Sequence, residues 1–368
     1  MLYNWQQADW PCFRYEVAGL TDLLLVFVDQ AGRVGGLLEG LPDDLGSEAM
    51  LDLMISEAIR SSAIEGETLD REAVMSSIRN RLGLNPVPQP VRSRLADGAG
   101  QLMVAVREHF REPLSAETLF EWHRMLLEGS TSLRVGCWRS GSEPMQVVSG
   151  RIDCPTVHFE APPSESVPAE MERFITWFNQ TAPGGPLAIF HAPVRSAIAH
   201  LYFESIHPFE DGNGRVGRAL AEKALSQGLG RPVLMSLSRS IDANRSAYYA
   251  ALQAVQRGNE ITPWIRWFVS TVVDAQRDAG EQIQFLLKKT RFFQQLGPVL
   301  NDRQTKVLRR MFEAGPAGFI GGMNARKYVA LTGTSKATAT RDLQHLTDLG
   351  ALTSIGGGRS TRYELRFH

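Results

Sequence analysis

The chain has 368 residues, of which 43% are hydrophobic and 21% are charged, and its formal net charge is −1. These values are ordinary for a globular protein with room for two or three domains. Neither secretion nor membrane insertion is expected, because the start lacks a basic region with a cleavage site and Leu23 to Val28 is too short to span a bilayer.

The three cysteines are Cys12, Cys137 and Cys154, and none of them belongs to a Cys-x-x-Cys pair. Scattered cysteines of this kind are typical of reduced thiols in a cytosolic protein. We therefore expect a cytoplasmic chain. No His-rich spacing suggests a zinc site.

Residues 1–85 are predicted to form a helical module that begins with Trp5, Trp10 and Phe13. One helix is expected around Leu20 to Gln30. A second has an apolar face and runs into Ser61-Ser62-Ala63-Ile64-Glu65-Gly66, where Gly66 suits a helix stop; this face consists of Leu51, Met54, Ile55, Ala58 and Ile59. Taken alone, Glu65 is an ordinary terminal glutamate. A proline-rich joint follows at residues 85–90.

Residues 92–296 are predicted to be a helical core, interrupted by loops and a hairpin between residues 135 and 163. Within this region Val157, His158, Phe159 and Glu160 form an extended segment just before Ala161-Pro162-Pro163. Residues alone indicate a surface hairpin here. His191 and His200 lie on an apolar helix expected over Leu187 to Ile206, and we interpret them as core or surface residues rather than metal ligands.

One loop carries the chemistry of the sequence. It connects the helix that ends near Ile206 with a helix expected over Val216 to Leu229, and it reads His207-Pro208-Phe209-Glu210-Asp211-Gly212-Asn213-Gly214-Arg215-Val216-Gly217-Arg218. Pro208 stops the first helix. Gly212 and Gly214 permit a backbone nest of N–H groups beside the start of the next helix, which is an arrangement that binds phosphate oxygens.

The side chains of this loop fit the same ligand. Arg215 and Arg218 are three residues apart, share a helix face and can both reach phosphates. Asp211 offers a hard oxygen for Mg²⁺, which substrate phosphates can complete. His207 can be neutral near pH ~6.5 and accept a proton from an attacking hydroxyl. The combination predicts a site for a nucleotide polyphosphate.

This loop resembles the defining motif of the Fic family, His-Pro-Phe-x-Asp/Asn-Gly-Asn-Gly-Arg-x-x-Arg, at every defined position. The resemblance implies transfer of AMP from ATP to a Ser, Thr or Tyr hydroxyl of a target protein, with release of pyrophosphate. It makes His207 the general base and Asp211 the Mg²⁺ ligand. It assigns phosphate binding to the rest of the loop, namely Gly212, Asn213, Gly214, Arg215, Val216, Gly217 and Arg218. The phosphorylating Doc-like branch carries a lysine near the second glycine, so Gly214 favours AMP transfer.

The resemblance also extends to Ser61 through Gly66, which match the Ser/Thr-x-x-x-Glu-Gly/Asn inhibitory motif of Fic proteins. It implies that Glu65 pairs with Arg218 and so keeps ATP from binding productively. We therefore expect an autoinhibited enzyme. In the reverse direction, Glu65 could orient a water that removes AMP from a modified protein, and this hydrolase is an alternative.

Two further features are implied by the resemblance. The segment of Val157, His158, Phe159 and Glu160 falls where Fic proteins have a flap that aligns the target by β-pairing and borders the nucleotide site. Tyr248 and Tyr249 match a tyrosine pair of the adenine and ribose pocket, although one of the two is expected in the core in any case. A homodimer is expected only from the resemblance.

Residues 301–368 differ from the rest in charge, with a formal +6 against −7 for the remainder. Their pattern resembles a winged helix-turn-helix: helices over Asp302 to Glu313, Asn324 to Thr332 and Lys336 to Leu349, then two strands around a glycine turn. The expected nucleic-acid side chains are Thr334, Ser335, Lys336, Thr338, Thr340 and Arg341 at the reading helix, with Arg359 and Arg362 on the wing. A winged helix used for protein contact or dimerisation is equally compatible.

The sequence thus predicts a mainly α protein with three parts: a helical module over 1–85, a Fic catalytic domain over 92–296 with a small β-hairpin flap, and a winged-helix domain over 300–368. The leading function is an autoinhibited protein adenylyltransferase that uses ATP and Mg²⁺. The alternative from another class is a DNA-binding regulator whose Fic core acts as a sensor.

Overall fold

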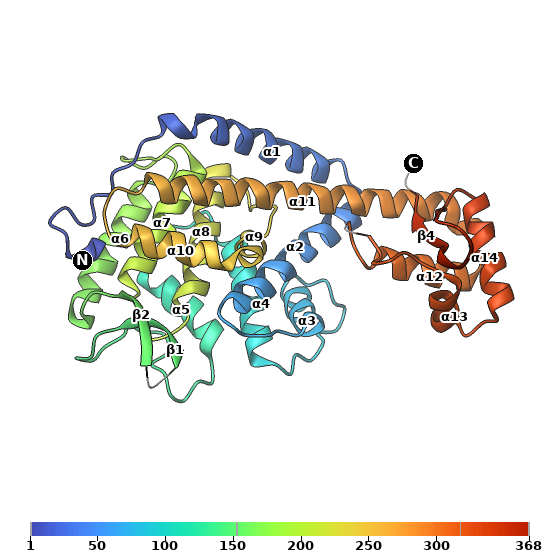
Figure 1. The fold of residues 1–368 in the computed structure, drawn as a ribbon. Helices are drawn as coiled ribbons and strands as arrows, with labels where there is room; N and C mark the ends of the chain where they lie inside the picture. Colours follow the sequence, from blue (N-terminus) through green and yellow to red (C-terminus); the bar gives the residue numbers. More distant parts are fainter. Residues whose placement is uncertain (1, 152–153, 317, 367–368) are drawn as a thin grey trace. The chain divides into compact units, whose positions relative to one another are not determined.

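The computed structural model describes residues 2–151, 154–316 and 318–366 of the chain. It is built mostly of helices, with two small antiparallel sheets of two strands each in the described residues (Figure 1). The predicted mainly α fold is confirmed. No helix among the described residues is long and apolar enough to cross a membrane.

Contacts divide the chain into two compact units, residues 1–35 with 50–279 and residues 36–49 with 280–368. The helices of residues 1–279 are α1 (Thr21–Glu39), α2 (Asp43–Ile64), α3 (Arg71–Arg81), α4 (Arg94–Glu108), α5 (Ala116–Leu127), α6 (Val167–Gln180), α7 (Ala192–Ile206), α8 (Asn213–Leu229), α9 (Leu237–Ala243), α10 (Arg245–Val255) and the first half of α11 (Thr262–Leu296). Short 3-10 turns lie at Asn4–Gln6, Ala18–Leu20 and Ser164–Ser166.

Helices α7 and α8 form the centre of the first unit. Every residue of α7 is buried, and α8 lies against α4, α5 and α7 (Figure 1). One apolar core packs α2, α3, α4, α5 and α6 against one side of this pair, and a second packs α1, α10 and α11 against the other. The loop between α7 and α8 is therefore held from both ends by buried helices.

A β-hairpin interrupts the helices of this unit, as the sequence predicts. Strand β1 (Gln146–Arg151) pairs antiparallel with β2 (Cys154–Glu160), and the register shifts between Val147 and Val148. Phe159 is buried and its ring meets that of Tyr3 edge-on at 5.1 Å. The indole of Trp5 donates to the carbonyl of Glu160 at 2.7 Å. The base of the hairpin is thus fixed by the N-terminal segment.

Two helix limits differ from the prediction. The helix expected from Leu187 begins at Ala192, because residues 181–191 fold back in turns and Pro193 occupies the first turn, where its missing N–H is not needed. Phe190 consequently lies outside the helix and is 93% exposed. The next helix begins at Asn213 rather than at Val216, so Gly214 lies within the first turn of this helix.

The second unit contains the C-terminal residues. Helices α12 (Asp302–Phe312), α13 (Ala325–Thr332) and α14 (Lys336–Asp348) precede the hairpin of β3 (Leu352–Ile355) and β4 (Arg362–Leu365), with 3-10 turns at Gly297–Val299 and Gly358–Ser360. Their apolar faces surround Phe292, Leu308, Phe312 and Leu343. The predicted order of three helices and a two-stranded wing agrees with these elements.

Candidate active site

The site begins with His207, which directly follows α7. It is the one residue other than glycine with a positive φ among the described residues, at 51°. Such a conformation is uncommon for a residue with a Cβ and has to be held by its surroundings. Arg139 holds it: its Nε donates to the carbonyl of His207 at 2.8 Å, while its backbone N–H donates to the carbonyl of Pro208 at 2.9 Å.

The same guanidinium also reaches the segment that follows the hairpin. Arg139 Nη2 donates to the carbonyls of Pro162 and Ile206, and Nη1 donates to Ser164 Oγ at 2.8 Å. Arg139 is only 4% exposed. One buried side chain therefore fixes both the backbone of the candidate base and the end of the hairpin.

The loop after His207 is closed by Asn213. Its side chain accepts from the N–H of Phe209 and donates to the carbonyl of the same residue, both at 2.9 Å. Gly212, with φ 80°, begins α8. His123 supports the loop from α5: its ring stacks on Phe209 at 4.0 Å, its Nδ1 accepts from the N–H of Gly136, and Nε2 lies 3.1 Å from the Asp211 carbonyl. These contacts fix the loop without a ligand.

Arg218 is almost wholly buried, at 1% exposure, and three groups from the end of α2 surround it. Glu65 Oε1 lies 2.8 Å from its Nη1, Ser61 Oγ accepts from Nε at 3.0 Å, and the Ser61 carbonyl accepts from Nη2 at 2.7 Å. Burial disfavours the charged guanidinium, but the Glu65 carboxylate outweighs it and the pKa of Arg218 is raised. The structure thus brings together the predicted pair of Glu65 and Arg218.

The carboxylate of Glu65 lies in space that is open because residue 214 is glycine. A Cβ on Gly214 would lie 2.1 Å from Glu65 Oε1 and 3.0 Å from Arg218 Nη1. The first contact is far shorter than a van der Waals distance, and the second is tight. Gly214 therefore provides the space that the glutamate occupies.

Arg215 also contacts a carboxylate, that of Glu67, which the sequence alone did not indicate. Its Nη1 donates to both carboxylate oxygens of Glu67, each at 2.8 Å, and its Nη2 lies 3.6 Å from Asp211. Arg215 is 3% exposed, whereas the side chain of Glu67 is 27% exposed. Both arginines of the loop therefore bind carboxylates that lie two residues apart in the chain.

A cavity of about 630 Å³ opens beside these groups. Its polar lining includes His207, Glu65, Glu204 and Tyr248, and its apolar lining comes from α10 and the hairpin; the full set is Glu65, Val147, Val148, His158, Phe159, Glu204, His207, Gly214, Ser246, Tyr248, Tyr249, Ala250, Leu252, Gln253 and Gln256. Its volume is in the range of small-molecule sites. The candidate base, the glutamate of the predicted inhibitory motif and two residues of the predicted flap thus share one cavity.

The two tyrosines play different parts in this cavity. Tyr248 is 2% exposed and its hydroxyl lies 2.9 Å from His200 Nε2, so it is the core member of the pair. Tyr249 is 42% exposed and donates to the carbonyl of Ile64 at 3.2 Å. Tyr249 therefore faces the end of α2, next to Glu65.

Of the predicted flap residues, His158 and Phe159 line the cavity, and Val157 and Glu160 do not. Val157 is 39% exposed on the hairpin surface. Of the predicted phosphate-binding residues, Val216 and Gly217 are buried inside α8, where a Cβ on Gly217 would come within 2.4 Å of Glu204 Oε1. These two positions serve packing in this structure.

The titratable groups at the bottom of the cavity have shifted pKa values. Burial, with Arg139 nearby, lowers the pKa of His207 to about 4. Burial, with the Glu65 carboxylate nearby, raises the pKa of Glu204 to about 8. His207 Nδ1 and Glu204 Oε1 are buried without a hydrogen-bond partner in the described residues. Unsatisfied polar atoms of this kind are uncommon in a core and are typical of a functional site.

A magnesium ion was expected at Asp211. Its side chain is 54% exposed, and one of its oxygens accepts from the N–H of Gly212 at 2.6 Å. No cluster of three or more potential metal-binding side chains occurs within the described part of the chain. An exposed carboxylate can hold Mg²⁺, which keeps several waters and is completed by substrate phosphates, so the residues present fit this ion.

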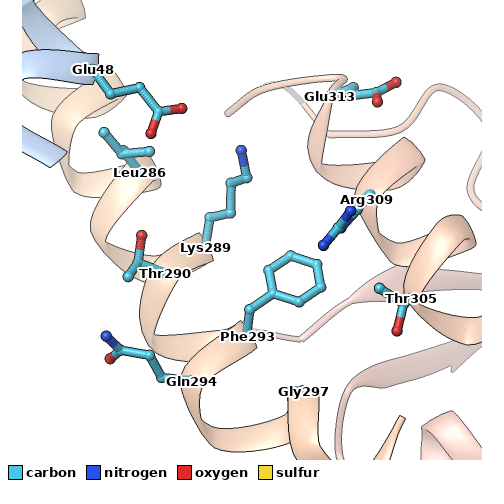
Figure 2. Close-up of a pocket in the computed structure, with 10 residues that line it drawn as sticks. All are labelled: Glu48, Leu286, Lys289, Thr290, Phe293, Gln294, Gly297, Thr305, Arg309 and Glu313. Atoms are coloured by element: carbon cyan, nitrogen blue, oxygen red, sulfur yellow. The ribbon is translucent and has the colours of Figure 1, made fainter. Parts of the chain in front are cut away.

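A second groove, of about 610 Å³, lies in the unit of residues 36–49 and 280–368. Figure 2 shows Lys289 and Arg309 directed toward this space from α11 and α12, with Phe293 between them. Glu48 and Glu313 also border it, so the lining has two cations and two anions. The lining residues have no net formal charge, and none of them belongs to the loop 207–218. We therefore assign this groove no role in the chemistry of that loop.

Comparison with known proteins agrees with the geometry of the loop. Residues 113–225 match the family described as Fic/DOC. The chain carries a Fic domain. Residues 3–84 match a domain of unknown function, DUF4172, and residues 306–366 match the C-terminal domain of the transcriptional regulator DIP2311-like family.

Relatives of this Fic domain are named protein adenylyltransferases. That of Nematostella vectensis is 25% identical over 234 residues, which are 63% of this chain and 49% of that protein. That of Caenorhabditis elegans is 27% identical over 162 residues, which are 44% of this chain and 27% of that protein. The chain therefore spans half or less of the length of these relatives.

A Fic family protein from Desulfovibrio desulfuricans shares the fold along almost the whole chain. Its crystal structure superposes with a TM-score of 0.56 at 23% identity, and the match covers 96% of this chain and 98% of that one. The likeness thus includes the regions before and after the Fic domain.

Proposed function

We propose that this protein is an autoinhibited protein adenylyltransferase, which transfers AMP from ATP to a hydroxyl side chain of a target protein and releases pyrophosphate. The observation that carries the proposal is the shared cavity: His207, the Glu65 and Arg218 pair and Tyr248 all border or lie next to one space. The names of the relatives support the same reaction.

The chemistry requires an in-line attack of the target hydroxyl on the α-phosphorus, with the bond to the β-phosphate oxygen breaking. In such transfers the protein contributes mainly position and charge. His207 accepts the proton of the hydroxyl; its lowered pKa leaves the imidazole neutral and ready to accept at neutral pH. The N–H groups at the start of α8 and the side chains of Arg215 and Arg218 bind the phosphates.

Asp211 would hold Mg²⁺ together with the phosphates of ATP. When bound, the ion neutralises part of the phosphate charge. The exposed carboxylate of Asp211 is oriented for this by the N–H of Gly212. The adenosine would occupy the part of the cavity between α10 and the hairpin, which is bordered by Tyr248, Tyr249 and Phe159.

Inhibition follows from the occupation of Arg218. Glu65 puts a carboxylate where a phosphate oxygen would bind, and it takes the charge of the arginine. Because Arg218 is buried, leaving it without an anion is costly, and ATP has to displace the Glu65 carboxylate before it can bind this arginine. Activity therefore requires an event that moves the end of α2.

The test uses ATP labelled at the α-phosphate with wild type, Glu65→Gly and Glu65→Gly/His207→Ala. We expect labelled protein only in samples that contain Glu65→Gly. In these samples the label should be on Glu65→Gly itself and on the target protein. Label from γ-labelled ATP would instead indicate phosphorylation. Free AMP released from a modified target by wild type, and lost in Glu65→Gly, would indicate the hydrolase. Absence of transfer in every sample, including cell extract as a source of target, would contradict the enzyme.

A second function concerns residues 301–368. They match the C-terminal domain of a transcriptional regulator family and carry a formal +6. Lys336, Thr340 and Arg341 are exposed on α14, and Thr334 and Thr338 lie half-buried at its start, next to Ser335, which caps the helix. On the wing, Arg362 is exposed, and the side chain of Arg359 lies outside the described residues.

We infer that this unit binds duplex DNA through α14. The test measures the affinity for duplex DNA at several salt concentrations, for the full chain and for Lys336→Ala/Arg341→Ala. Each phosphate contact that is lost should reduce the salt slope by about 1. Equal affinities and slopes for the two proteins would favour a protein-binding role for this unit.

A further inference from the structure

We propose that Glu67 is a second inhibitory carboxylate, which closes the Arg215 half of the phosphate site while Glu65 closes the Arg218 half. This inference rests on the proposed function and concerns the regulation of the same site. The observation behind it is the bidentate pair of Glu67 with Arg215, in which one guanidinium nitrogen lies 2.8 Å from both oxygens.

In this pair the guanidinium contacts two oxygens of one anion, as an arginine also does when it binds phosphate. Arg215 is 3% exposed and Nη1 is fully engaged by Glu67, and its Nη2 faces Asp211 at 3.6 Å. Its Nε is buried without a hydrogen-bond partner in the described residues. Glu67 therefore occupies Nη1 of this guanidinium, and a phosphate that binds at Nη1 has to displace the glutamate.

Energetics favour an exchange of anions over simple opening. A buried arginine that loses its carboxylate is costly unless another anion replaces it. A polyphosphate is such an anion, and it can satisfy Arg215 as Glu67 does. Glu67 is 27% exposed, so its carboxylate can return to water at a lower cost than that of uncovering the arginine. ATP would thus have to replace two carboxylates, one at each arginine.

The two carboxylates are mechanically linked. The N–H groups of Glu65 and Glu67 both donate to the carbonyl of Ser62, at 3.1 and 3.0 Å, and Gly66 between them turns the chain with φ 86°. This short turn ends α2. A movement of the end of α2 would therefore withdraw both glutamates at once, whereas the substitution Glu65→Gly removes only one and leaves Arg215 closed.

Glu67 could instead hold Arg215 in its productive position, and the two roles predict opposite results. If Glu67 inhibits, its replacement strengthens nucleotide binding. If it only positions Arg215, the replacement weakens binding. The measurement is therefore the affinity for Mg²⁺ and ATP, which does not depend on a target protein.

The experiment titrates ATP with Mg²⁺ into wild type, Glu65→Gly, Glu67→Gln and Glu65→Gly/Glu67→Gln by calorimetry. Glu72→Gln is the matched control, since Glu72 is an exposed glutamate in the first turn of α3, five residues further along. We expect the double variant to bind ATP roughly tenfold or more tightly than Glu65→Gly, and Glu72→Gln to bind as wild type does. Equal or weaker binding by the double variant overturns the proposal.

Two further results keep the outcome clear. Glu67→Asp keeps the charge but shortens the side chain, so in the Glu65→Gly background it should give an affinity between those of Glu65→Gly and the double variant. It replaces Glu67→Gln if that variant does not fold, as judged by thermal unfolding. Failure of all variants to bind ATP would contradict the proposed function itself, whereas binding by Glu65→Gly without a gain in the double variant contradicts only the role of Glu67.

Discussion

The carboxylate of Glu204 lies beside the imidazole of His207, with Oε2 3.7 Å from Nδ1. The two residues are one helical turn apart, Glu204 within α7 and His207 just after its end, and Glu204 is 5% exposed. An ionised Glu204 would stabilise the imidazolium that forms when His207 accepts a proton, as acidic residues do for catalytic histidines elsewhere.

Glu204 should therefore make the rate of AMP transfer rise with pH. Its pKa, about 8 in the closed protein, is raised first by burial and next by Glu65, so Glu65→Gly should move it below that value. In Glu65→Gly the rate should increase as pH rises toward about 8, and Glu204→Gln in the same background should lack this increase and be roughly tenfold slower at the upper end. ATP affinity should stay the same. A Gln variant with an unchanged pH profile would show that Glu204 does not act on His207.

His207 itself should remain an active base in mild acid. The base must be neutral, and its pKa is lowered from 6.5 to about 4, so protonation should set in only below about pH 5. Glu65→Gly/Glu204→Gln removes the titration of Glu204, and its initial rates of AMP transfer between about pH 5 and 7 should show no loss that corresponds to a group near pH ~6.5. A half-maximal rate at that pH would mean that His207 has an ordinary pKa in the open enzyme.

Glu204 should also affect stability, with the opposite dependence on pH. Its folded pKa is raised above the ordinary 4.5, so its contribution to stability is fully present below about 4.5 and is lost as pH rises through about 8. Glu204→Gln cannot ionise. The thermal midpoint of wild type minus that of Glu204→Gln should therefore fall by roughly several degrees between about pH 5 and 9. All other titrating groups are common to the two proteins, so a constant difference would contradict the raised pKa.

Arg139→Lys should destabilise the protein strongly. A lysine cannot serve the carbonyls of His207, Ile206 and Pro162 together with Ser164, and each buried acceptor left unpaired costs about 1–3 kcal/mol. Urea unfolding should show a loss of at least ~2 kcal/mol. Arg111→Lys is the control, since Arg111 is exposed and donates to one carbonyl, that of Gly230; its effect should be within about 0.5 kcal/mol.

Ser61→Ala should loosen the closed site without opening it. The substitution removes the hydroxyl that accepts from Arg218 Nε but keeps the Ser61 carbonyl and Glu65 in contact with the guanidinium. We expect ATP to bind about threefold to tenfold more tightly than to wild type, which is a smaller gain than that of Glu65→Gly. Ser62→Ala is the neighbouring control, buried to the same degree. The same ATP affinity for wild type and Ser61→Ala would show that the hydroxyl does not contribute to inhibition.

Local patterns in the sequence were sufficient to predict the helical fold and the hairpin, whereas the contact of Glu65 with Arg218 was expected only from the resemblance to the Fic family. Helix α7 is rich in apolar residues, and Gly66 and Gly212 occupy positions with positive φ that glycine favours. The misplaced start of α7 arose because Leu187, Ile189 and Phe190 continue an apolar pattern that the chain does not use as a helix.

The groups missed in the sequence are those whose role depends on distant contacts. Glu67 and Arg215 are 148 positions apart, and Arg139 lies 68 positions before His207. His123 contacts the loop across 88 positions. Spacing along one chain does not reveal such pairs. Only Glu204 left a local signal, since it lies one helical turn before His207 and is the one acidic residue of α7.

The absence of a side chain at Gly214 links two proposed properties of this protein, its inhibition by Glu65 and its transfer of AMP rather than phosphate. A larger residue at 214 would force the carboxylate of Glu65 out of its present position beside Arg218, since the added Cβ would lie 2.1 Å from it. The resemblance to the Fic family gives the same position a second meaning, because the phosphorylating branch carries a lysine near the second glycine. We therefore expect that Gly214→Lys would disturb the contact of Glu65 with Arg218 and would change the orientation of the nucleotide through one substitution. Inhibition by Glu65 and the choice of the group that is transferred from ATP would then change together.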